Sequence, residues 1–138
     1  MLRATRILAI GSLGVAAAQP VPAAAASPPA AATAKLGQRA RLGGVAVTPV
    51  RVEEDSRCPA GVQCIWAGRL RLAVRIRDRG ARRAAVLTLG RPHRTGNWWL
   101  TLCSARPHPA KGGPVPRAAY RFRFSLGRDG PPDCGAGG

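Results

Sequence analysis

The chain has 138 residues, with 22 lysines and arginines against 6 aspartates and glutamates, so its formal net charge is +16. This length excludes more than one domain once any leader is removed, and it allows only a modest core. The charge predicts attraction to polyanions that weakens as salt is added. Charge alone does not choose among nucleic acid, anionic lipid headgroups, lipopolysaccharide and acidic wall polymers.

The start of the chain has the features of a secretory signal peptide. Arg3 and Arg6 precede an uncharged, mostly apolar run at residues 7–18, and small residues follow it. The run is short for an uncleaved membrane anchor, which needs about 20 apolar residues. Of two Ala-x-Ala sites we favour the later, near Ala26, so that residues 1–26 are removed. No cysteine lies near this site, so no lipid attachment is expected, and the mature protein should be periplasmic or secreted.

Two segments flank the expected folded unit. Residues 27–34 are a Pro/Ala stretch with nothing to bury, and we interpret them as a disordered linker. Residues 127–138 have the same character apart from one cysteine, and we interpret them as a flexible Gly/Pro tail. The folded domain is therefore predicted at residues 35–126.

Alternation of apolar and polar residues predicts an all-β domain. In residues 69–77 the leucines, valine and isoleucine share one face and arginines occupy most of the other, as in a half-buried antiparallel strand. Residues 120–126 repeat this pattern. Further strands, separated by turns with Gly or Pro, are expected at 38–42, 45–52, 84–89 and 98–104. About six or seven short strands and no helix predict a small antiparallel β-sandwich, which we favour over a small barrel.

Cys58 and Cys64 flank a short turn containing Pro59 and Gly61. In an exported chain this spacing favours a structural disulfide. A thioredoxin-type redox pair would have two intervening residues. A zinc site would need two further ligands at spacings that the sequence lacks.

Cys103 and Cys134 remain, and in an oxidising compartment two leftover cysteines usually pair. Closing a loop of this length would stabilise the domain by roughly 3–4 kcal/mol. The alternatives are a buried free Cys103 and an intermolecular bridge through Cys134.

Residues 54–59 (EDSRCP) and 64–68 (CIWAG) carry the most distinctive motif. They resemble a signature of small bacterial secreted proteins and lipoproteins of unknown function, in which DSRCP and C-x-W-x-G precede an alternating strand. Residues 99–102, 107–109 and 120–122 are similar to the end of those proteins. The resemblance spans about residues 45–126 and implies no activity. Cys103 and Cys134 depart from the pattern.

Two interpretations of this motif remain open. In the structural one, Asp55 and Ser56 start a turn, Arg57 pairs with an acidic neighbour, Trp66 packs over the disulfide and Gly68 allows a close approach. In the functional one, Asp55, Ser56, Arg57 and Trp66 form a ligand site on a rigid loop.

No catalytic, metal or cofactor site is predicted. The two histidines, His93 and His108, lie in expected loops, and no G-x-S-x-G elbow or glycosidase pair of acids is present. A copper site of these histidines with Cys103 lacks both the usual spacing and a methionine. Trp98 and Trp99 could form a stacking platform, but one of two adjacent strand residues usually faces the core.

We therefore expect a non-enzymatic exported β domain, without cofactor, that contacts anionic polymers or a membrane surface through arginines. Arg71, Arg75 and Arg123 are the candidate contacts, and they form one continuous basic surface if their strands share a sheet. The sequence has no specific nucleic-acid motif and does not predict the oligomeric state. The alternative is a ligand-binding or inhibitor-like module that uses the loop from Asp55 to Trp66.

Overall fold

The structure is a computed structural model that describes residues 14, 17–23, 30–111 and 113–135. Most of the predicted signal peptide, and residues 27–29 of the predicted linker, lie outside the described residues. Within the described part of the chain, no helix is long and apolar enough to cross a membrane.

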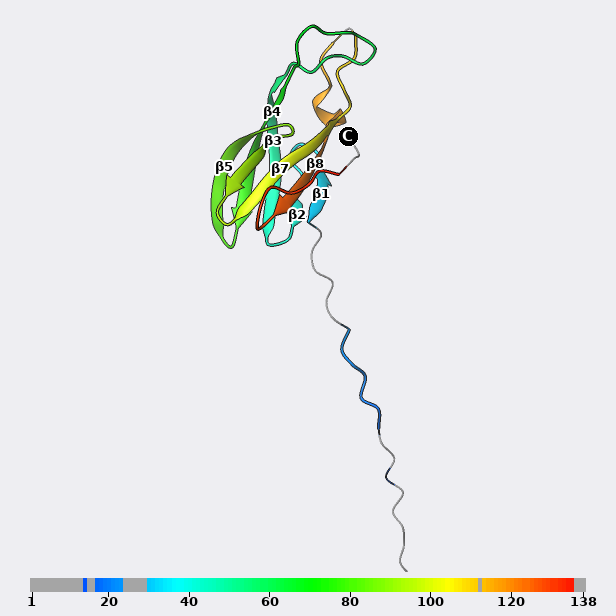
Figure 1. The fold of residues 1–138 in the computed structure, drawn as a ribbon, viewed down its shortest axis with the longest axis vertical. Coiled ribbons are helices and arrows are strands. Elements are labelled where there is room, and N and C mark those ends of the chain that lie inside the picture. Colours follow the sequence, from blue (N-terminus) through cyan, green and yellow to red (C-terminus); the bar gives the residue numbers. More distant parts are fainter. Residues whose placement is uncertain (1–13, 15–16, 24–29, 112, 136–138) are drawn as a thin grey trace, which may run out of the picture.

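Two four-stranded antiparallel sheets face each other, which confirms the predicted β-sandwich (Figure 1). Sheet I has the order β2 (Ala40–Leu42), β3 (Val45–Asp55), β4 (Leu70–Asp78), β5 (Ala81–Thr88). Sheet II has the order β1 (Ala31–Ala34), β8 (Arg121–Gly127), β7 (Trp98–Arg106), β6 (Pro92–Thr95). A single 3-10 turn, η1 (Arg117–Ala119), precedes β8 in the described chain.

The alternating strands supply the core between the sheets. Every second residue of β4 from Leu70 to Ile76 is at most 2% exposed, as the period of two predicts. From sheet II, Phe122 and Phe124 on β8 pack into the same cluster with Leu100 on β7. The arginines between these apolar positions consequently lie on the outer faces of the sheets.

The described part of the chain has eight strands rather than six or seven, and the domain begins earlier than predicted. Ala31–Ala34, expected to be part of a disordered linker, form β1 and pair with β8, and Ala34 is buried. Alanines show no alternation of polarity, so this strand has no sequence signal; backbone pairing to the edge of β8 orders it. Pro92–Thr95, expected to be a turn, form β6, where the proline occupies the first position of an edge strand.

The described part of the C-terminal segment is also not the free tail that was predicted. It runs back along the outer face of sheet II (Figure 1), where Cys134 bonds to Cys103 and its carbonyl accepts a hydrogen bond from Arg123 (2.9 Å). A Cβ at Gly127 would lie 2.3 Å from the carbonyl oxygen of Gly130, so this reversal requires glycine.

Candidate functional site

The outer face of sheet I carries arginines from β2, β4 and β5, and one more from the residue that precedes β2. Strand pairing aligns Arg41, Ala46, Arg77 and Arg82 in one row across all four strands. The neighbouring row on β3, β4 and β5 is Thr48, Arg75 and Ala84. We call the arginines on this side the arginine face: Arg39, Arg41, Arg75, Arg77 and Arg82.

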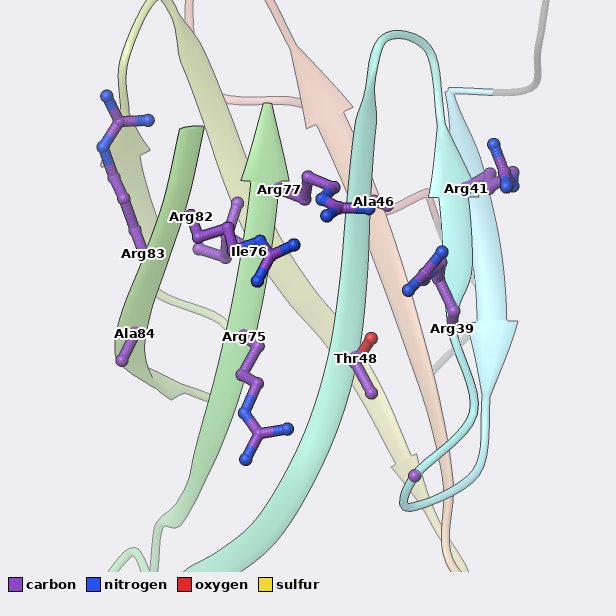
Figure 2. Close-up of a pocket in the computed structure, with 11 residues that line it drawn as sticks. Arg39, Arg41, Ala46, Thr48, Arg75, Ile76, Arg77, Arg82, Arg83 and Ala84 are labelled. Atoms are coloured by element: carbon purple, nitrogen blue, oxygen red, sulfur yellow. The ribbon is translucent and has the colours of Figure 1, made fainter. Parts of the chain in front are cut away.

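Short side chains between these arginines hollow the face into an open groove of about 1110 Å³. Ala46 and Thr48 on β3 lie between Arg39 and Arg41, at and before β2, and the arginines of β4 and β5 (Figure 2). No acidic residue lines the groove in the described part of the chain. Arg83 also borders it but points away from the other arginines, because its partner Ile76 faces the core.

The arginine face places two like charges on directly opposite strand positions, with no acidic residue beside them. Arg77 and Arg82 are directly opposite each other on adjacent strands, an arrangement that normally destabilises a sheet by a few tenths of a kcal/mol or more. The ion pairs of the described residues all lie elsewhere: Arg51–Glu53, Arg57–Asp55 and Arg69–Glu54. An anion bound over the groove would relieve this repulsion.

The prediction that Arg71, Arg75 and Arg123 form one continuous basic surface is wrong in part. Arg123 lies on β8 in sheet II, where it bonds to the C-terminal segment, so it cannot join the arginine face. Arg71 lies near the other end of β4, directly opposite Glu54. Of the three candidates, only Arg75 lies on the arginine face.

At the opposite end of β4 the predicted motif forms a buried polar network. The Arg57 side chain is only 6% exposed, and its Nε and Nη2 donate to the two carboxylate oxygens of Asp55 (2.7 and 2.8 Å). Its remaining donors reach the carbonyl oxygens of Ala105 and Pro107. The Tyr120 hydroxyl donates to Asp55 Oδ2 (2.8 Å). These bonds tie the end of β3 to the end of β7 and the start of β8.

This arrangement occupies Asp55 and Arg57 within the fold and agrees with the structural interpretation of the motif for those two residues. Ser56 bonds to Glu54 and to the carbonyl oxygen of Arg69. Trp66 differs from expectation, because its side chain is 64% exposed instead of packed over the disulfide. Tyr120 was not predicted as part of the network, since alternation marks it only as inward-facing.

Both cysteine pairs form disulfides, Cys58–Cys64 and Cys103–Cys134. Such bonds persist in oxidising compartments and are rare in reducing ones. They are typical of proteins that fold outside the cytosol.

Two residues of the buried network have shifted pKa values. Burial of the Asp55 carboxyl opposes its ionisation, but hydrogen bonds from Arg57 and Tyr120 outweigh burial and hold the pKa below its ordinary value. Burial of the phenol, together with its hydrogen bond to the Asp55 carboxylate, raises the pKa of Tyr120 to about 12.

Tyr120 is the only tyrosine of the chain, so its titration can be followed directly. We expect phenolate absorbance near 295 nm to rise with an apparent pKa of about 12 in the folded protein and near 10 in denaturant. Because folding raises the pKa of Tyr120, its protonated hydroxyl contributes fully to the free energy of unfolding below pH 10. This contribution is lost as the pH rises toward 12. A folded protein titrating at pH 10 would contradict the hydrogen bond to Asp55.

The described residues contain no cluster of three or more metal-ligating side chains. Trp98 packs against the core and is covered by Arg128, while Trp99 lies beneath Arg94. The two tryptophans therefore do not form an open stacking platform.

The chain matches no model of a known protein family, and no curated protein or solved structure is significantly similar to it. The resemblance of residues 54–59 and 64–68 to small exported bacterial proteins stays a prediction.

Proposed function

We propose that this chain is an exported, non-enzymatic β-sandwich domain that binds anionic polymers through the arginine face. One observation carries the proposal: arginines cover the outer face of sheet I above short side chains, with no acidic residue lining the groove in the described chain. The signal-peptide features and the two disulfides support a location in the periplasm or outside the cell.

The mode of binding follows from the chemistry of the face. Guanidinium groups pair well with phosphate, sulfate and carboxylate oxygens. The groove has no aromatic side chain for base stacking among its lining residues, so recognition would depend on charge rather than on base sequence. We expect affinity to fall steeply with salt, because each neutralised polymer charge releases a counterion.

The test replaces Arg75, Arg77 and Arg82 with serine and measures binding to heparin and to a labelled DNA oligonucleotide. We expect affinity at low salt to fall about 10- to 100-fold, since three exposed ion pairs contribute about 0.5–1 kcal/mol each. The salt dependence should become shallower by about three units on a log–log plot for DNA, since each phosphate contact contributes about 0.9. Stability should hardly change, because the side chains are exposed and one replacement removes the Arg77–Arg82 repulsion.

A matched control removes the same charge from elsewhere. Arg91, Arg106 and Arg128 are exposed and lie on sheet II or in segments next to it. Their replacement by serine should change affinity by less than about threefold, through net charge alone. Equal weakening by both triple variants would show that overall charge, not the arginine face, binds the polymer.

A further inference from the structure

The segments 56–69 and 107–119, residue 112 excepted, lie together at one end of the sandwich, beyond the ends of β3 and β7 and before β8 (Figure 1). The backbone N–H of Ala60 donates to the carbonyl oxygen of Pro109 and joins the two segments (3.1 Å). Immediately after the cystine ring, Ile65 is 95% exposed and Trp66 is 64% exposed. We call this adjacent pair of large apolar side chains the apolar tip.

The backbone that carries the apolar tip is held in place on both sides. The Cys58–Cys64 disulfide closes the ring before it, and the buried Arg57 network anchors the start of the loop. After the tip, Gly68 packs so tightly against the chain that a Cβ there would lie 1.7 Å from the carbonyl oxygen of Ser56. This loop holds the two side chains in a fixed position in solvent. A preorganised pair of exposed apolar side chains is typical of a binding surface, and we interpret it as one.

Charge around the apolar tip indicates an anionic partner. Neither segment 56–69 nor segment 107–119 contains an aspartate or glutamate. Lys111 and Arg117 are exposed in the second segment, whereas the charge of Arg69, at the end of the first, is paired with Glu54. The end of the domain therefore combines apolar side chains with positive charge.

We propose that the apolar tip inserts into the interfacial region of an anionic lipid bilayer. A stable protein interface buries about 800 Å² on each partner, and two side chains on a convex loop offer far less surface than that. A bilayer accepts such a protrusion, since apolar residues penetrate about 5–10 Å and tryptophan prefers the headgroup boundary. Flanking lysine and arginine side chains add attraction to anionic headgroups.

This site is separate from the arginine face. The six-residue step from Arg71 to Arg77 on β4 spans about 20 Å, and the apolar tip lies beyond its first end. A bilayer at the tip and a polymer on the face can be bound at the same time, and each site can be removed without the other.

The test uses the full chain without its signal peptide and vesicles of phosphatidylglycerol and phosphatidylethanolamine, with phosphatidylcholine vesicles for comparison. Parent protein should sediment with the anionic vesicles, and brominated acyl chains should quench Trp66 fluorescence. Trp98 lies at the opposite end, beside Gly43, and should not be quenched. Replacing Ile65 and Trp66 with serine should weaken vesicle binding at least tenfold. Val86→Ser, which removes an exposed apolar side chain from β5, serves as the matched control and should have no effect.

Two outcomes overturn this proposal: equal vesicle binding by the parent and the double serine variant, or bound vesicles without quenching. Failure of the parent to bind anionic vesicles at low salt overturns it as well. The polymer assay distinguishes the two proposals. The double serine variant should keep heparin affinity, whereas the Arg75, Arg77 and Arg82 variant should lose it and still show quenching at saturating vesicles.

Discussion

Arg57→Ala should destabilise the domain by about 3–5 kcal/mol, the cost of removing one partner from a buried ion pair. The change leaves the carboxylate of Asp55, whose side chain is 10% exposed, with only the Tyr120 hydroxyl and a long hydrogen bond from the backbone N–H of residue 57 (3.4 Å). It also leaves the carbonyl oxygens of Ala105 and Pro107 without this donor. Small domains are stable by only about 5–15 kcal/mol in total, so this single change should bring the protein close to unfolding at ambient temperature.

Equilibrium unfolding in guanidinium chloride at neutral pH, with the disulfides intact, measures this loss of stability. Arg69→Ala is the control, because Arg69 also pairs with a carboxylate, that of Glu54, but its side chain is 63% exposed. The control should lose less than about 1 kcal/mol. Arg57→Lys should recover only part of the loss, since an ammonium cannot reach four acceptors in the plane that a guanidinium spans. If Arg57→Ala is no worse than Arg69→Ala, the network does not stabilise the fold as its geometry indicates.

The Arg57 network also shows where prediction from the sequence stops. The pairing of Arg57 with an acid two residues away is local, and the sequence indicates it as one option. The contacts to Ala105, Pro107 and Tyr120 span 48 to 65 residues of chain. They depend on how the ends of three strands meet, which no local pattern reports.

Alternation of residues determines which face of a strand a side chain takes but not which sheet the strand joins. Arg75 and Arg123 occupy equivalent positions in two similar alternating segments. One lies on the arginine face, and the other lies on sheet II beneath the C-terminal segment. Predicting the basic groove thus requires the strand order, whereas the β class and the Cys58–Cys64 disulfide can be predicted from local spacing alone.

Strands without alternation were missed for a related reason. β1 consists of three alanines and a threonine, and β6 begins at a proline, so each has only one of the β-branched or aromatic residues that mark strands, a single threonine. Both are ordered by backbone pairing to β8 and β7, which are already fixed by the core.

Replacing both Cys103 and Cys134 with serine should destabilise the domain by about 4 kcal/mol, compared with about 2 kcal/mol for the same change at Cys58 and Cys64. The difference follows from loop length in the chain-entropy model, because the first disulfide joins residues 31 apart and the second joins residues 6 apart. For a domain of this size the losses correspond to about 16–32 °C and about 8–16 °C in Tm. Thermal unfolding followed by circular dichroism measures both.

The longer disulfide should stabilise the fold without contributing to either proposed binding site. It holds the C-terminal segment on the outer face of sheet II, where Thr101 and Ser125 are almost fully buried, whereas the arginine face belongs to sheet I. Below its Tm, the Cys103→Ser, Cys134→Ser variant should therefore keep the heparin affinity of the parent. It should also expose Arg123, whose hydrogen bond to the Cys134 carbonyl depends on the segment staying in place. A variant that melts like the parent would show that backbone contacts alone hold the segment, and a folded variant that loses heparin affinity would place part of the polymer site on sheet II.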